Sequence, residues 1–300
     1  MKSKTNVLFP IVLTLATTMA VFTYSCSEDK TAKPSLAVSI EPQRYILENL
    51  TGDDYDIVTL MPNGANPETY EISVANRAAL EKATACFTTG FFPFENTLAL
   101  TGENHNKVML TTHGIDLIYG THNHEDNHNE FLHADDAHRN ADPHVWTSIG
   151  NVRIIARNMA ADLVAINPSD SAVVEQRLAA FEHRLDSIGN AVESALTPVR
   201  GKSFLVWHPS LTYFARDYGL NQIAVGAHTK ELSPKAMRDI IDHAREDSVR
   251  VFFFQEEFDS RQAEALNSGI GSEIVKINPS SYDWEGQLNV IVNALAARQQ

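Results

Sequence analysis

The sequence contains few cysteines and has a deficit of positive charge. Only two cysteines, Cys26 and Cys86, occur among 300 residues, which excludes a zinc site built from several thiolates. Lysine and arginine total 24 against 38 aspartate and glutamate residues, so the formal net charge is −14. Nucleic-acid binding needs clustered Lys and Arg, so we expect no nucleic-acid partner. An acidic chain instead attracts cations to its surface.

A run of apolar residues long enough to cross a bilayer is also missing. The stretch from Val7 to Phe22 is apolar apart from scattered Thr and one Pro. At about 16 residues it is shorter than the roughly 20 that a transmembrane helix needs. Lys2 and Lys4 precede it, which is typical of a secretory signal peptide. We therefore expect an exported protein, located in the periplasm or at the cell surface.

The end of the apolar stretch indicates how the leader is processed. Ser25 stands directly before Cys26, and a small residue before such a cysteine resembles a bacterial lipobox, although Thr23 replaces its usual Leu. Cleavage there would leave Cys26 as a lipidated N-terminus that holds the protein to a membrane. Ordinary cleavage that removes Cys26 is the alternative. We expect a leader over residues 1–26 and a polar tether over residues 27–35.

Short apolar runs alternate with helical patterns in both halves of the chain. Continuous apolar strands separated by helices favour parallel sheets. We predict two α/β lobes with mostly parallel sheets, over residues 36–168 and 198–300. The expected strands are LAVSI (36–40), YDIVTLM (55–61), ACFTTG (85–90), KVML (107–110), SFLVW (203–207), QIAV (222–225), VRVFFF (249–254) and EIVKI (273–277).

One long helix is predicted between the two halves. From Val174 to Ala195, apolar residues recur at alternating spacings of four and three, which places them on one helix face. Asn167-Pro168-Ser169 provides a start and Thr197-Pro198 an end. At 1.5 Å per residue the helix would be about 42 Å long. We interpret residues 169–197 as a rigid backbone helix that joins the lobes, although a surface helix would show the same stripe.

Residues 121–138, THNHEDNHNEFLHADDAH, are rich in histidine. HEDNH matches the H-E-x-x-H pattern of zinc peptidases, in which both histidines share a helix face. The interleaved asparagines are weak helix formers and no apolar stripe would bury such a helix, so we reject a peptidase. We interpret the segment as a loop that collects metal weakly; a solvated loop without this role is the alternative. Its histidines are His122, His124, His128, His133 and His138.

Three other stretches carry candidate ligands for an ordered metal site. Glu68 lies in MPNGANPETYEIS, His144 in ADPHVWTSIGN and His208 in VWHPSLTYFARDYGL. Glu68 and His208 follow predicted strands, and ligands of α/β sheets gather beyond the carboxyl ends of strands. One carboxylate and two imidazoles suit a first-row divalent cation. Taken singly, His144 could serve a helix start and Glu68 could be a solvated loop charge.

These stretches resemble the zinc- and manganese-binding periplasmic proteins of ABC transporters, the ZnuA/TroA type. GANPETYEI, DPHVW and HPSLTYFARDYG are similar to the family motifs G-A-N-P-H-T-Y-E-P, D-P-H-x-W and H-P-x-x-x-Y-x-x-x-x-Y-G. The similarity covers most of the chain from Leu36 onward. The resemblance implies two α/β lobes joined by a rigid helix, with a metal held in the cleft by Glu68, His144 and His208. A histidine-rich insertion is frequent in the zinc-binding members.

Two departures from the family pattern affect the ligand set. Glu68 stands where the family usually has its first histidine, and Asn278 stands where it often has an aspartate before proline. A neutral amide is a weak ligand, so water, Glu257, Asn278 and Gln255 all stay open as the fourth ligand. A carboxylate shifts preference toward harder ions such as Mn²⁺, whereas the histidine loop favours Zn²⁺. We expect Zn²⁺, with Mn²⁺ as the alternative.

The resulting hypothesis is a binding protein rather than an enzyme. A monomer anchored by lipid would capture Zn²⁺ between its lobes and deliver it to an ABC transporter permease. The rival is a zinc hydrolase, because two histidines and one glutamate with an open position also form a catalytic zinc set; Glu257 would then be the general base. A manganese-specific binding protein and an adhesin that uses the same surface are further alternatives.

Overall fold

The computed structural model describes most of the chain as one compact unit, Lys33–Gln300. Several predicted features lie outside the described residues, namely the leader, Cys26, the histidines of residues 121–138, and Glu257. The described residues are 33–99, 106–120, 141–226, 233–255, 258 and 260–298.

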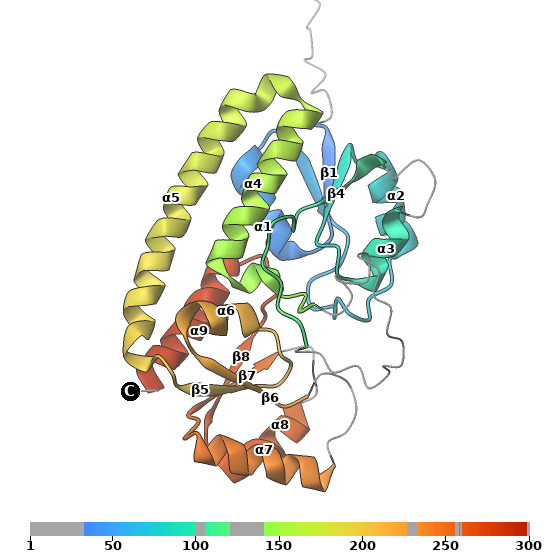
Figure 1. Ribbon diagram of the computed structural model, residues 1–300. Coiled ribbons are helices and arrows are strands. Elements are labelled where there is room, and N and C mark those ends of the chain that lie inside the picture. Colours follow the sequence, from blue (N-terminus) through green and yellow to red (C-terminus); the bar gives the residue numbers. More distant parts are fainter. Residues whose placement is uncertain are drawn as a thin grey trace, which may run out of the picture. The chain divides into compact units, whose positions relative to one another are not determined.

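The first lobe is built on a four-stranded parallel sheet with the order β2-β1-β3-β4. Alternate residues of the central strands face opposite sides: Leu36 and Val38 join the main core with α1 and α4, whereas Ala37 and Cys86 pack toward α2 and α3 (Figure 1). The strands are β1 (Ser35–Val38), β2 (Asp56–Thr59), β3 (Ala85–Thr88) and β4 (Val108–Leu110), and the helices are α1 (Glu41–Thr51), α2 (Val74–Lys82) and α3 (Pro93–Ala99).

The second lobe repeats this architecture, with a parallel sheet in the order β6-β5-β7-β8. Phe204 and Phe253 join the main core, whereas Phe252 and Phe254 face α7 and α8 on the other side. The strands are β5 (Ser203–Val206), β6 (Asn221–Ala224), β7 (Val251–Gln255) and β8 (Glu273–Ile277), and the helices are α6 (Thr212–Tyr218), α7 (Pro234–Glu246), α8 (Ser260–Ile270) and α9 (Trp284–Arg298). All eight predicted strands overlap observed strands, so the predicted fold class is confirmed.

Two consecutive helices lead from the first lobe to the second. Helix α4 (Ile149–Ile166) covers the first sheet, and α5 (Ser171–Leu196) then returns along it and enters the second lobe (Figure 1). Helix α5 contacts α1 and α4 of the first lobe and α9 of the second. Its apolar stripe, including Val174 and Phe181, is buried in a core shared by both lobes. The predicted linking helix is therefore confirmed, although Pro168–Asp170 forms a 3-10 turn before it begins.

Both sheets direct the carboxyl ends of their strands toward the loops that hold the candidate ligands. In each sheet, the next two strands of the chain lie on opposite sides of the first strand. The strand order therefore reverses between β1 and β3 in one sheet and between β5 and β7 in the other. Loops diverge at such points and leave a crevice. No helix among the described residues is both long enough and apolar enough to cross a bilayer.

Candidate metal centre

Glu68, His144 and His208 converge on one point between the lobes. Glu68 lies in the loop between β2 and α2, His144 directly precedes the 3-10 turn η4 (Val145–Thr147), and His208 follows β5. Each offers a ligand atom, and these atoms all lie within 4.8 Å of one another. Within the described residues, no other trio of His, Cys, Asp or Glu comes together in this way. The structure thus brings together the three residues expected to bind metal.

The distances at this point are those of a nearly assembled coordination sphere. Glu68 Oε1 lies 3.4 Å from His208 Nε2, and the centroids of the His144 and His208 rings are 5.1 Å apart. Two ligands bound tetrahedrally at about 2.1 Å from Zn²⁺ are themselves about 3.4 Å apart. The Glu68–His208 pair already has this separation. The candidate ligand atom of His144 lies within 4.8 Å of the other two.

The candidate ligands are withdrawn from water to different degrees. His144 is 4% exposed and His208 is 6% exposed, whereas the Glu68 side chain keeps 19% exposure. Beside the two histidines is a cavity of about 10 Å³, which is roughly the space needed for one water molecule. Glu68 is therefore the ligand nearest to solvent, and it is not a solvated loop charge.

Asp142 orients the His144 ring. Its carboxylate Oδ1 accepts a hydrogen bond from His144 Nδ1 and another from the His144 backbone N–H, both at 2.9 Å. With Nδ1 engaged as a donor, Nε2 is the nitrogen left to bind a metal. His144 precedes η4 but makes no side-chain capping hydrogen bond there. A role in starting the helix therefore does not account for this histidine.

Gln255 holds the loop of His208 from the end of the neighbouring strand β7. Its Oε1 accepts from the His208 backbone N–H at 3.1 Å, and its Nε2 donates to the His208 carbonyl and to Ser210 Oγ, both at 2.7 Å. Gln255 is completely buried. Its amide is engaged in fixing the His208 loop, which disfavours it as a fourth ligand.

Asn278 is engaged in contacts between the lobes. Its Nδ2 donates to Asn63 Oδ1 at 3.2 Å, and its Oδ1 accepts from the Ser280 backbone N–H at 3.1 Å. These bonds occupy the amide and disfavour it as a ligand. The cavity beside the histidines instead has room for one water molecule.

Two tryptophans fasten the lobes together next to the candidate site. Trp146 Nε1 donates to the Pro279 carbonyl, and Trp284 Nε1 donates to the Trp146 carbonyl, each at 2.8 Å. The Trp146 ring also lies 5.5 Å from the ring of His144, centroid to centroid. This reciprocal pair fixes η4, and hence the His144 loop, against the second lobe.

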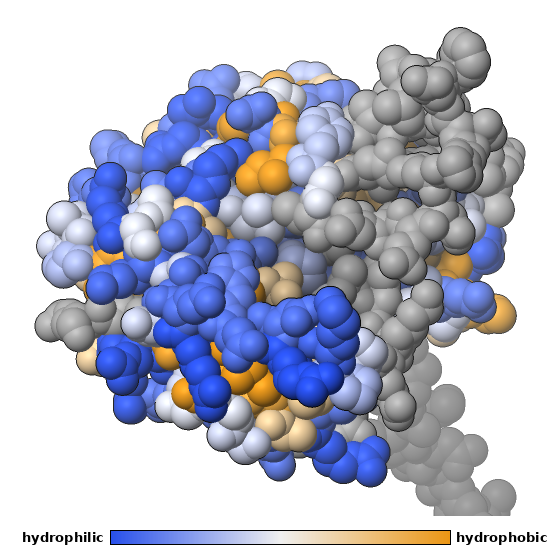
Figure 2. Space-filling model, turned by 60° about the horizontal axis from the view of Figure 1, so that its bottom comes forward, coloured by the Kyte–Doolittle hydropathy of each residue, from blue (hydrophilic) through white to orange (hydrophobic). Residues whose placement is uncertain are grey.

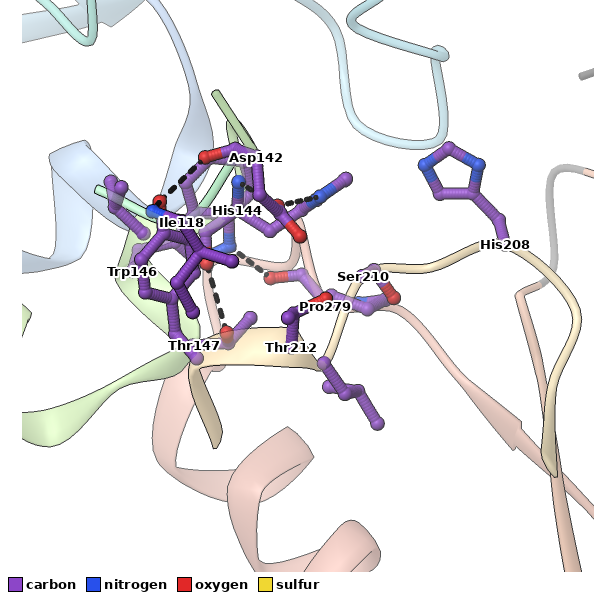
Figure 3. Close-up of polar contacts among 12 residues, drawn as sticks. Ile118, Asp142, His144, Trp146, Thr147, His208, Ser210, Thr212 and Pro279 are labelled. Carbon is purple, nitrogen blue, oxygen red and sulfur yellow. Dashed lines mark hydrogen bonds and ion pairs between the residues drawn. The ribbon is translucent and has the colours of Figure 1, made fainter. Parts of the chain in front are cut away.

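Sequence reasoning missed Asp142, and it considered Gln255 only as a possible fourth ligand and not as the support of the His208 loop. Asp142 stands two residues before His144, and Gln255 is the one polar residue of VFFFQ. A buried aspartate in a D-P-H motif and an amide that ends an apolar strand are the signals that could have identified them. Figure 3 shows Asp142 beside His144, with His208 on the neighbouring loop.

The parallel lobes, the linking helix and the acid-and-imidazole trio between the lobes define a two-lobed α/β protein with a candidate metal site between its lobes. The particular family is shown by a family model described as "ZnuA: Zinc-uptake complex component A periplasmic", which matches residues 36–293. The chain belongs to this family, and the resemblance noted in its motifs is confirmed.

Curated relatives include zinc-binding proteins of Streptococcus and a zinc uptake protein of Bacillus. The zinc-binding lipoprotein AdcA of Streptococcus pneumoniae is 25% identical over 283 residues, which cover 90% of this chain and 55% of AdcA. The high-affinity zinc uptake system protein ZnuA of Bacillus subtilis is 24% identical over 265 residues, which cover 85% of this chain and 81% of that protein. The chain spans about half the length of the AdcA proteins that it matches.

Solved structures agree with the fold. A crystal structure of ZnuA has a TM-score of 0.78 at 29% sequence identity and covers 89% of this chain and 100% of its own. A zinc-bound deletion mutant of ZnuA has a TM-score of 0.77 at 30% identity, with 88% and 97% covered. Both superpositions extend over the two lobes.

Proposed function

We propose that this protein captures Zn²⁺ between its lobes and delivers it to an ABC transporter permease. The observation that carries the proposal is the convergence of Glu68, His144 and His208 within 4.8 Å. It is supported by family membership and by the zinc-binding names of the relatives. The protein acts as a carrier, so the metal is its cargo and undergoes no reaction.

The ligand set and its surroundings favour Zn²⁺ over Mn²⁺. Two imidazoles are ligands that suit zinc, whereas manganese prefers more oxygen ligands. The 3.4 Å separation of Glu68 Oε1 and His208 Nε2 matches a tetrahedral zinc site. A single water in the adjoining cavity would complete four-coordination. The one carboxylate neutralises part of the charge of the ion beside two buried rings.

The same cavity argues against a zinc hydrolase. Catalysis requires room for a substrate beside the metal-bound water. The space next to His144 and His208 is about 10 Å³, which is enough for roughly one water. Binding without turnover is therefore the better account.

We propose the following division of the chain around this site. Residues 1–26 form a leader that ends in lipidated Cys26, and residues 27–35 form a tether to the membrane. Lobes of residues 36–168 and 198–300, joined by residues 169–197, hold the metal, and residues 121–138 collect it. The face seen in Figure 2 is mostly hydrophilic, with apolar side chains gathered in patches between the polar ones.

Calorimetric titration of the purified protein with Zn²⁺ and Mn²⁺ tests the assignment. One tight Zn²⁺ site is expected, with much weaker binding of Mn²⁺. Glu68→Ala, His144→Ala and His208→Ala should each weaken Zn²⁺ binding by at least about 100-fold, since each removes a direct ligand. The matched controls Glu71→Ala and His183→Ala change exposed residues and should bind as the wild type does.

Tight Zn²⁺ binding that survives all three substitutions would refute the proposed site. Hydrolysis of peptide or phosphate esters that His208→Ala abolishes would instead favour the hydrolase. A preference for Mn²⁺ in the same titrations would retain the site and change its cargo.

A further inference from the structure

We propose that Asp142 is a positioning residue that presents His144 to the metal, and that Tyr213 of the second lobe holds Asp142 in place. A ligand of the first lobe would thereby be oriented from the second lobe. The inference rests on the proposed function for its metal-binding consequence. The hydrogen bonds that support it involve only groups of the protein.

Asp142 accepts hydrogen bonds from both the ring and the main chain of His144. The same oxygen, Oδ1, accepts from His144 Nδ1–H and from the His144 backbone N–H, so the ring cannot rotate without breaking the first of these bonds. Asp142 is completely buried, where hydrogen bonds to a charged acceptor are strong. A carboxylate on the far nitrogen of a metal-binding histidine fixes its tautomer and raises its basicity.

The backbone of Asp142 is held in a closed ring of three hydrogen bonds. Its N–H donates to the Ile118 carbonyl at 2.7 Å, and its carbonyl accepts from the Tyr213 hydroxyl at 2.9 Å. The Tyr213 oxygen in turn accepts from the Ile118 N–H at 3.2 Å. The Tyr213 hydroxyl thus serves as donor to one of the two segments and as acceptor from the other. Figure 3 shows Ile118 and Asp142 facing each other beside His144.

Tyr213 brings this support from the second lobe. It lies in α6, five residues after His208, and is completely buried. Burial raises the pKa of its phenol to about 12, so the hydroxyl keeps its proton and its role as donor at neutral pH. If α6 moved away from the first lobe, the Asp142 carbonyl would lose its hydrogen bond from Tyr213. His208 would move away from His144 at the same time.

The two histidines are therefore supported differently. Gln255 holds His208 from within the same lobe, whereas Tyr213 reaches His144 through Asp142 across the lobe boundary. Docking of the lobes would complete both the ligand trio and the orientation of its first-lobe imidazole. Separation of the lobes would weaken the site through two of its ligands at once.

Competition titration with Zn²⁺ measures the effect on binding. Asp142→Ala should weaken Zn²⁺ affinity by roughly 10- to 100-fold, as is usual when the hydrogen-bond acceptor behind a metal-binding histidine is removed. Asp142→Asn keeps an oxygen that can accept from Nδ1–H and should retain most of the affinity. Tyr213→Phe removes both hydrogen bonds of the hydroxyl, one to the Asp142 carbonyl and one from the Ile118 N–H, and should weaken Zn²⁺ affinity about fivefold.

Tyr218→Phe is the matched control. Tyr218 is a buried tyrosine of the same helix, and its ring packs on Phe214 with a centroid distance of 5.0 Å. Removal of its hydroxyl leaves the Asp142 ring of hydrogen bonds intact, so affinity should match the wild type. If Tyr213→Phe and Tyr218→Phe weaken binding equally, the role assigned to Tyr213 is overturned.

The histidine tautomer gives a readout that general destabilisation does not move. Nitrogen-15 NMR of the metal-free full chain at pH 8, with His144→Ala to assign the signals, should show His144 protonated at Nδ1. Asp142→Ala should convert His144 to a mixture or to the Nε2-protonated form, and Asp142→Asn should restore Nδ1. An unchanged His144 tautomer in Asp142→Ala would overturn the inference.

The tautomer and the titration also separate the two proposals. If the His144 tautomer depends on Asp142 but the wild-type protein binds no Zn²⁺ tightly, the proposed function is refuted and the positioning role of Asp142 is retained. If the protein binds Zn²⁺ tightly and Asp142→Ala does not change the affinity, the proposed function is retained and the positioning role of Asp142 is refuted.

Discussion

Replacement of Gln255 by leucine tests how strongly the His208 loop depends on its buried amide. Leucine has a similar size but removes three hydrogen bonds, to the His208 N–H, the His208 carbonyl and Ser210 Oγ. Each bond contributes about 1 kcal/mol net. The His208 carbonyl also accepts from the Ser210 N–H at 2.7 Å, and leucine adds apolar surface. We therefore expect a loss of about 2 kcal/mol in the free energy of unfolding.

Urea unfolding of the metal-free protein, followed by tryptophan fluorescence, measures this loss. The midpoint should fall with an unchanged slope, because the surface exposed on unfolding stays the same. Zinc affinity should fall about tenfold, since the loop that carries His208 is no longer fixed. Gln176→Leu changes an exposed glutamine of α5 and should stay within about 0.5 kcal/mol of wild type. A Gln255→Leu midpoint equal to that of Gln176→Leu would refute the reasoning.

Three further predictions concern the metal and pH. Deletion of residues 121–138 should leave one tight Zn²⁺ site and remove only weaker binding in calorimetric titration; loss of the tight site would place principal ligands in the loop. Zinc affinity should be lower at pH 5.5 than at pH 7.5, because protons compete with the metal for the imidazoles, and equal affinities at the two pH values would contradict this. Burial raises the pKa of Tyr213 from 10.0 to about 12, so its contribution to stability is complete below about pH 10 and is lost as pH rises through about 12. Between pH 9 and 12, Tyr213→Phe should lose less of its circular dichroism signal than the wild type does. Identical profiles for the two proteins would contradict the raised pKa of Tyr213.

Much of the fold could be predicted because its signals are local. Each strand is a short apolar run, and the stripe from Val174 to Ala195 specifies one face of α5 without reference to other elements. The boundaries were less exact: α5 begins at Ser171 rather than Ser169, since Pro168–Asp170 forms a separate 3-10 turn. Helix ends are set by competing turn geometries that composition alone does not resolve.

The candidate ligands could be identified from the sequence because they lie in short motifs, two of which follow strands. Their convergence could be predicted only through the resemblance to a known family, since Glu68 and His208 are 140 positions apart in the sequence. The supports of those ligands could not be predicted. Gln255 meets His208 only because β7 pairs with β5 in the sheet, and Tyr213 meets Asp142 only because the lobes dock.

This difference follows from how the site is divided between the lobes. A ligand on a short loop can be recognised from its neighbours in the sequence, but its orientation depends on whatever packs against that loop. His144 illustrates the point, because Asp142 fixes its ring, Trp146 binds the Pro279 carbonyl of the second lobe, and Tyr213 of α6 closes the contact. The bonds of Trp146 and Asp142 therefore both depend on groups of the second lobe. On the proposed function, a small separation of the lobes would loosen the His144 imidazole together with the His208 contact.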